Sequence, residues 1–98
     1  MIIEIKKNMD NTTIEVSGRL DTTTAPILEK TINENLNDIK LLVLDFKNLV
    51  YISSAGLSVL LTAQRKMKSD YIMEITNVCD EIMSVFKMTG FVDILKIV

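Results

Sequence analysis

Two apolar patterns follow one another in the middle of this chain. Residues 41–46 form an almost unbroken apolar run of strand length, apolar on both faces as a central parallel strand covered by helices requires. Apolar residues then recur at about helical spacing and predict a helix over residues 55–68. Its stripe contains Leu57, Leu60, Leu61 and Met67.

Alternating residues predict a β-hairpin at the start of the chain. Residues 2–6 and about 12–17 alternate between apolar and polar, with turn-forming residues between them, and residues 17–21 end the hairpin. A helix follows, because a threonine of the 22–24 run can cap it and Pro26 suits its first turn. We expect this helix to pack on one side of a sheet. Its apolar stripe contains Leu28, Ile32, Leu36 and Ile39.

The last third of the chain predicts a strand, a helix and a final short strand. Residues 71–76 resemble a strand, Asp80 is a candidate N-cap, and Gly90 is expected to end the helix in the left-handed conformation. Residues 91–98 offer a helical turn and a last strand. The order β-β-α-β-α-β-α-β predicts an α/β fold with a mixed, mostly parallel sheet, an N-terminal hairpin and packed helices.

Two loops leave the carboxyl ends of the predicted strands, at residues 18–24 and 45–56. Binding sites of open α/β sheets gather at such loops, so we expect the two to be neighbours. The pattern leaves the strand order open, because the hairpin fits either at an edge or astride the parallel strands.

The composition fits one folded domain, residues 1–98, with 48% hydrophobic and 24% charged residues. A net charge of −2 without a basic patch argues against nucleic acid and anionic membranes as partners. No apolar run reaches the ~18 residues of a membrane span, and the N-terminus resembles a strand rather than a signal peptide. We therefore expect a cytoplasmic protein without membrane insertion.

Two absences restrict the chemistry. The chain has no histidine and one cysteine, which excludes Ser-His-Asp and Cys-His arrangements and histidine-containing metal sites. Cys79 is expected to be a small buried residue rather than a nucleophile. Asp21 and Asp45 do not resemble a catalytic pair, since no substrate pocket, metal cluster or glycine-rich phosphate loop accompanies them. The sequence thus predicts no enzyme, no cofactor and no metal.

Ser53 and Ser54 fall at the predicted N-terminus of the 55–68 helix. Free N–H groups and the helix dipole favour either a serine cap or a phosphate there. Gly56 is a poor helix former in this first turn, which indicates that something approaches its backbone closely, such as a partner loop or a kinase active site. On this interpretation, Gly56→Leu abolishes binding without unfolding the domain.

Three motifs together resemble one known family. Residues 51–57, Tyr-Ile-Ser-Ser-Ala-Gly-Leu, follow a Leu-Asp-containing strand and resemble the signature of the STAS domain of bacterial anti-sigma factor antagonists. Residues 16–26 resemble that family's first strand-to-helix junction, and residues 77–91 its C-terminal helix and turn. The family's phosphoacceptor is the serine two places before the glycine, here Ser54. The preceding residue is often aspartate, and here it is Ser53.

The resemblance implies an anti-sigma factor antagonist that carries its switch on Ser54. The unphosphorylated form would bind an anti-sigma factor, usually a serine kinase, and release the sigma factor; a serine phosphatase would reset the phosphorylated form. Two other roles of the fold stay open, a scaffold of stress-sensing assemblies and an accessory subunit of a lipid transport complex. The fold also occurs as a domain of anion transporters, but the sequence has no membrane segment, which argues against that role. Nucleotide binding is a further alternative that rests on the helix N-terminus alone. The implied partner-binding residues are Asp21, Thr22, Ser53, Ser54, Gly56 and Leu57.

Overall fold

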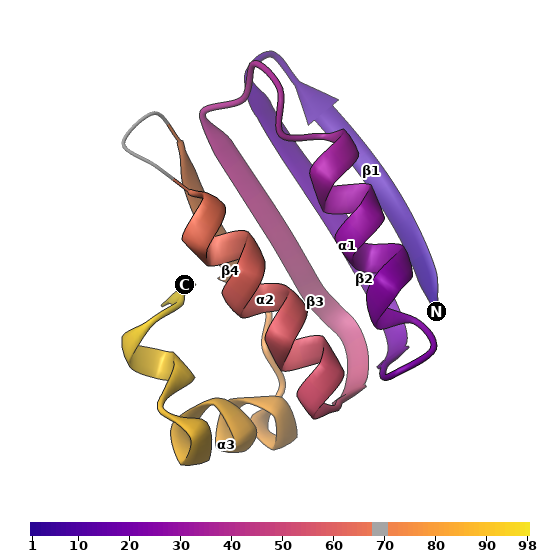
Figure 1. Cartoon of the computed structure of the whole chain (residues 1–98), viewed down its shortest axis with the longest axis vertical. Coiled ribbons are helices and arrows are strands. Elements are labelled where there is room, and N and C mark those ends of the chain that lie inside the picture. Colours follow the sequence, from indigo (N-terminus) through magenta and orange to yellow (C-terminus); the bar gives the residue numbers. More distant parts are fainter. Residues whose placement is uncertain (68–70) are drawn as a thin grey trace.

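The structure is a computed structural model that describes residues 1–67 and 71–98. Its helices and strands follow the order that the sequence predicts. The hairpin, the alternation of helices and strands and the helical turn before the last strand are confirmed (Figure 1). The elements are β1 (Ile2–Asn8), β2 (Asn11–Leu20), α1 (Ala25–Glu34), β3 (Leu41–Ile52), α2 (Ser54–Lys66), β4 (Ile72–Thr76), α3 (Asp80–Thr89), the 3-10 helix η1 (Phe91–Asp93) and β5 (Lys96–Ile97).

The strands form one sheet in the order β1-β2-β3-β4-β5. β1 pairs antiparallel with β2, whereas the later neighbours pair in parallel. The hairpin therefore lies at an edge of the sheet, which answers the question that the pattern left open. The predicted α/β fold with a mixed, mostly parallel sheet is confirmed.

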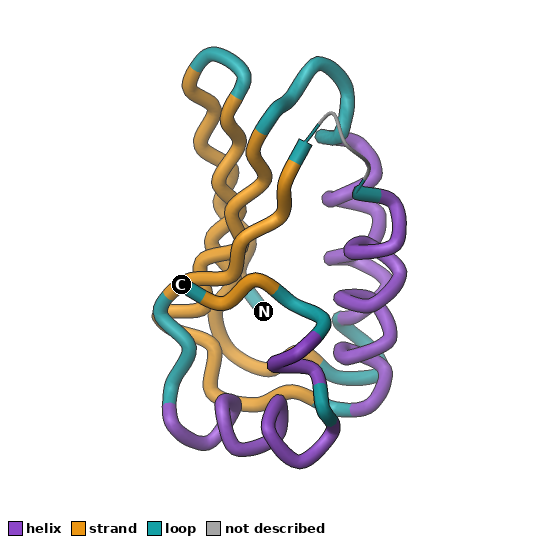
Figure 2. The backbone as a smooth tube through the Cα atoms, turned by 90° about the vertical axis from the view of Figure 1, so that its left-hand side faces the viewer, coloured by secondary structure: helices purple, strands orange, loops and turns teal. Residues whose placement is uncertain are grey.

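Helices α1 and α2 cover one face of this sheet, and α3 lies across the end of it (Figure 2). Each parallel strand is added on the same side of the previous one, so right-handed crossovers place successive helices on the same face. In the described part of the chain, the other face carries no helix. The expectation that residues 41–46 are covered on both sides is therefore wrong: Leu42, Leu44 and Phe46 are buried, but Val43 and Asp45 are only half-buried.

Two strands are longer than the sequence predicts. β2 continues to residue 20 rather than 17, and β3 continues to residue 52 rather than 46. The pairing between them shifts register twice, after Glu15 and after Gly18, because extra residues of β3 bulge out of the ladder. The buried residues of this extension are Phe46, Leu49 and Ile52. Because these residues are spaced three apart, this part of β3 lacks the period-two alternation that predicts a strand.

The helices differ from the prediction mainly at their ends. α1 stops at Glu34, so Leu36 and Ile39 follow the helix, although both still pack against the core. α2 starts at Ser54, and the predicted end at residue 68 lies outside the described residues. Its fully buried stripe is shifted from the predicted one, because Leu57 and Leu61 are only half-buried. That stripe consists of Gly56, Val59, Leu60 and Ala63.

One predicted boundary of the third helix, α3, is confirmed, and the other differs by one residue. Gly90 ends α3 with a φ of 78°, the left-handed conformation that was predicted. Asp80 is the first residue of the helix instead of its N-cap, which is Cys79. The Cys79 thiol is half-buried and lies 3.8 Å from the carbonyl oxygen of Leu49. It therefore takes part in packing α3 against β3, though it is less buried than expected.

Candidate functional site

The candidate site lies where β2 and β3 end and α1 and α2 begin, at the lower end of Figure 1. Leu20 pairs with Ile52 at the ends of the two strands, and the Ser53 N–H donates to the Leu20 carbonyl at 2.9 Å. These contacts hold the β2–α1 and β3–α2 junctions side by side. The predicted neighbourhood of the two loops is confirmed.

Ser53 and Ser54 are placed very differently. Ser53 is the N-cap of α2, in extended conformation, and its Oγ accepts from the Gly56 N–H at 3.4 Å. Ser54, the first residue of the helix, is exposed. Within residues 1–67 and 71–98, its hydroxyl takes part in no hydrogen bond. One serine therefore stabilises the helix end while the other presents a free hydroxyl beside the positive end of the helix dipole.

Asp21 organises the neighbouring junction as a turn cap. Its Oδ1 accepts from the Thr23 hydroxyl at 2.8 Å, from the Thr23 N–H at 3.0 Å and from the Thr24 N–H at 3.2 Å. These donors stabilise the ionised carboxylate, so they lower the pKa of Asp21 below its ordinary value of 3.8, with the Thr23 hydroxyl as the largest cause. The carboxylate thus fixes the loop that enters α1.

Replacing the Thr23 hydroxyl is expected to bring the pKa of Asp21 back toward 3.8. Because the folded-state pKa is lowered, the stability that Asp21 contributes is present above its unfolded pKa and is lost as the pH falls through the folded one. Thr23→Val should therefore be less stable than the unsubstituted protein at neutral pH, with the difference shrinking in acid. NMR titration of the Asp21 carboxyl carbon tests this. Thr23→Ser, which keeps the hydroxyl, should leave the pKa lowered; equal pKa values in both variants would contradict the assignment.

The other predicted site residues surround the two junctions. Thr22 is exposed and Leu57 is half-buried on the first turn of α2. Gly56 is buried, and its close neighbours belong to the chain itself: a Cβ there would lie 2.8 Å from both Leu20 Cγ and Ile52 Cγ1. The interpretation that a partner must approach its backbone is therefore wrong. The same geometry contradicts the expectation that Gly56→Leu leaves the fold intact.

An exposed cation–aromatic pair at this end of the sheet escaped the sequence analysis. The Arg19 guanidinium carbon lies 3.9 Å from the centre of the Tyr51 ring, and Arg19 Nε lies 3.7 Å from Asp21 Oδ2. Arg19 and Tyr51 are paired across β2 and β3. Their juxtaposition depends on the register shift, which no local pattern indicates. Arginine and tyrosine are common anchors of protein interfaces.

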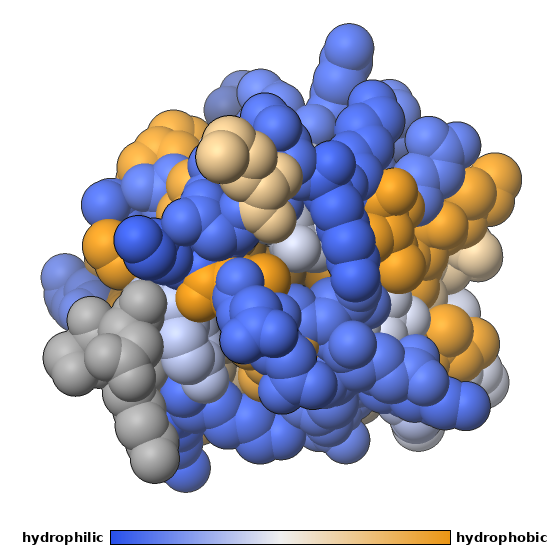
Figure 3. Space-filling model, turned by 90° about the horizontal axis from the view of Figure 1, so that it is seen from above, coloured by the Kyte–Doolittle hydropathy of each residue, from blue (hydrophilic) through white to orange (hydrophobic). Residues whose placement is uncertain are grey.

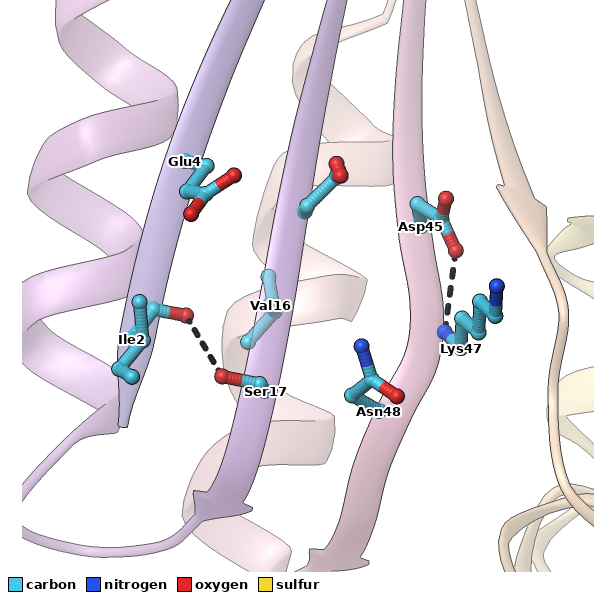
Figure 4. Close-up of a pocket in the computed structure, with 8 residues that line it drawn as sticks. Ile2, Glu4, Val16, Ser17, Asp45, Lys47 and Asn48 are labelled. Atoms are coloured by element: carbon cyan, nitrogen blue, oxygen red, sulfur yellow. Dashed lines mark hydrogen bonds between the residues drawn. The ribbon is translucent and has the colours of Figure 1, made fainter.

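A shallow hollow of about 260 Å³ lies elsewhere, on the open face of the sheet (Figure 4). It forms beside the register shift after Glu15, and carboxylates of Glu4, Glu15 and Asp45 line it together with Lys47. Asp45 Oδ1 accepts from the Lys47 N–H and from Asn77 Nδ2, both at 3.0 Å. Asp45 therefore lies inside β3 and stabilises the bulge.

Within residues 1–67 and 71–98, no group of three or more cysteine, aspartate or glutamate side chains could hold a metal ion. None of the helices in these ranges combines the length and apolar character needed to cross a membrane. The end of the molecule opposite the candidate site faces the viewer in Figure 3 and is covered mainly by hydrophilic side chains.

Comparisons with known proteins identify chains of the same fold. An anti-sigma factor antagonist from Mycobacterium paratuberculosis superimposes with a TM-score of 0.89 at 22% identity, over 98% of this chain and 83% of that one. The unphosphorylated anti-sigma factor antagonist SpoIIAA superimposes with a TM-score of 0.76 at 14% identity, over 99% of this chain and 87% of that one. The phosphorylated Bacillus cell fate determinant SpoIIAA superimposes with a TM-score of 0.76 at 15% identity, over 99% of this chain and 91% of that one.

At these identities the superpositions show a shared fold. No curated protein matches the sequence. The STAS domain model, by contrast, matches residues 2–98. The chain belongs to the STAS domain family.

Proposed function

We propose that this protein is an anti-sigma factor antagonist whose partner binding is switched by phosphorylation of Ser54. The observation that carries the proposal is the division of roles at the start of α2: Ser53 caps the helix, and the Ser54 hydroxyl is left exposed. A kinase can therefore modify Ser54 without removing the cap. The role is one of binding in the cytoplasm, without catalysis or a cofactor.

The structural neighbours support the proposal. They include the anti-sigma factor antagonists from Mycobacterium paratuberculosis and SpoIIAA, and SpoIIAA is known in both an unphosphorylated and a phosphorylated form. From the family resemblance we further propose that the partner of this chain is an anti-sigma factor that acts as a serine kinase, and that a serine phosphatase restores the binding form. The proposed docking surface consists of Asp21, Thr22, Ser53, Ser54 and Leu57, and buried Gly56 lies beneath it.

The physics of a phosphate at this position explains how binding could reverse while the fold persists. A phosphoserine adds about −1.5 to −2 charges and three acceptor oxygens. The N-terminus of α2 tolerates that charge within the domain. A closed interface does not, because burying an ion without a matched partner costs several kcal/mol.

Phosphate mapping tests the proposal directly. The purified protein is incubated with ATP and the soluble extract of its host, and its intact mass is measured before fragmentation places the modification. We expect a single phosphate on Ser54 that a phosphatase removes. Ser54→Ala should gain no phosphate, whereas Ser53→Ala, which loses only the cap, should still be modified. A phosphate on another residue, or none at all, would contradict the proposal.

A further inference from the structure

The edge strand β1 offers an unoccupied side. Its one neighbour in the described chain is β2, which leaves the backbone N–H and C=O groups along its outer side without a strand partner (Figure 1). Six of its seven residues are exposed, among them Ile2 and Ile5 with 66% and 44% of their surface accessible. Edges of this length are templates for pairing with another strand.

Charge alternates with apolar residues along this edge. Glu4 and Lys6 pair with Glu15 and Thr13 of β2 and lie on the open face of the sheet, whereas Ile5 pairs with buried Ile14 on the face covered by helices. Figure 4 shows the Glu4 carboxylate on the side away from the helices. An acid and a base thus stand two residues apart on one face, with an isoleucine between them on the other.

Twofold symmetry restricts how two copies of β1 could pair. In an antiparallel pair about an axis perpendicular to the sheet, each residue must face a residue whose side chain lies on the same face. The pairing is then centred on a single residue. A centre at Glu4 opposes two glutamates, and a centre at Lys6 opposes two lysines, and like charges in direct opposition are destabilising.

A pairing centred on Ile5 removes both like-charge contacts and replaces them with attractive ones. Glu4 of each copy then faces Lys6 of the other, which gives two cross-strand ion pairs, and the two Ile5 side chains cover each other. Ile5 is also the midpoint of Ile2–Asn8, so this register pairs the strand over its whole length. The charge pattern and the strand length select the same register.

We propose that β1 pairs antiparallel with β1 of a second copy of this chain, centred on Ile5, so that the two sheets join into one. The pairing buries the exposed parts of the isoleucines and hydrogen-bonds the free backbone edge. Lys6 can reach the partner because its side chain is 68% exposed in its ion pair with Glu15. The interface is independent of Ser54 and is unaffected by its phosphorylation.

Charge reversal tests the register. Sedimentation velocity over a wide concentration range should show a monomer–dimer equilibrium that weakens as salt is added. Glu4→Lys and Lys6→Glu should each raise the dimer dissociation constant about tenfold or more, because each turns both ion pairs into like-charge pairs. An equimolar mixture of the two variants should form a heterodimer, since opposite charges then face each other again.

Lys7→Glu is the matched control, because it makes the same charge change on the other face, opposite Ile3 of the second copy. Its dissociation constant should stay close to that of the unsubstituted protein. Circular dichroism checks that each variant is folded. The proposal is overturned by a protein that stays monomeric throughout, by dimers that the two reversals leave unchanged, or by a mixture that forms no heterodimer.

Discussion

Gly56→Leu is expected to leave the domain largely unfolded under conditions in which the unsubstituted protein is folded. A Cβ at this position would lie 2.8 Å from two buried side chains and 3.0 Å from the carbonyl oxygen of Leu20. That carbonyl already accepts from the Ser53 N–H, so it cannot move away without breaking the link between the two junctions. Inserting extra methylene groups into a well-packed core typically costs ~1–3 kcal/mol and occasionally more. A leucine adds four carbons, and the total stability of a domain is only about 5–15 kcal/mol.

Denaturant unfolding followed by circular dichroism measures the effect. Gly56→Ala is the intermediate case, because alanine recovers up to ~1 kcal/mol of helix propensity and so offsets part of the clash. Ser58→Leu adds the same side chain two residues later on the exposed side of α2, and should change the free energy of unfolding by no more than about 0.5 kcal/mol. If Gly56→Leu were as stable as Ser58→Leu, the contacts of Gly56 with Leu20 and Ile52 would not constrain the fold.

Ser54→Asp is expected to weaken binding to the anti-sigma factor by about 100-fold or more, whereas Ser54→Ala should bind like the unsubstituted protein. An unmatched charge in a closed interface costs several kcal/mol, and a 100-fold loss corresponds to ~2.7 kcal/mol. Within the domain the same aspartate lies in the first turn of α2, where a negative charge stabilises by about 0.3–1 kcal/mol. Binding should therefore fall while the free energy of unfolding stays equal or rises.

Titration calorimetry with the purified anti-sigma factor, beside thermal unfolding of each variant, separates the two effects. Thr62→Asp introduces the same charge at an exposed position two turns further along α2, and it should change the affinity by no more than a few-fold. Equal affinities of Ser54→Ala and Ser54→Asp would exclude the switch. A loss of binding in Ser54→Asp accompanied by unfolding would point to a damaged fold instead.

The sequence predicts most elements of this fold because their signals are local. The alternation in residues 2–6 and the glycine at position 90 each identify a structure within a few residues, and both predictions are confirmed. The extension of β3 beyond residue 46 carries no such signal. It exists because β2 offers a parallel partner and because bulges keep Phe46, Leu49 and Ile52 facing the core. Pairing between distant segments decides it, and local periodicity does not report on pairing.

The candidate site shows the same limit. The sequence predicts that the two loops meet and that serines occupy the start of α2. It does not distinguish the roles of Ser53 and Ser54, because the cap depends on the backbone conformation of one residue. It also misassigns Gly56, since a glycine that accommodates Leu20 and Ile52 has the same local pattern as one that accommodates a partner.

The spatial order of the strands has a consequence for how the protein is made. From β1 to β5, each strand pairs with the one that precedes it in the chain, so a growing polypeptide can add strands to the sheet in the order in which the ribosome synthesises them. No early strand has to wait for a late one to be inserted beside it. The short strand Lys96–Ile97 is likewise added beside β4, which precedes it in the chain. Synthesis at about 5–20 residues per second therefore gives the early strands time to pair while the later ones are still being made.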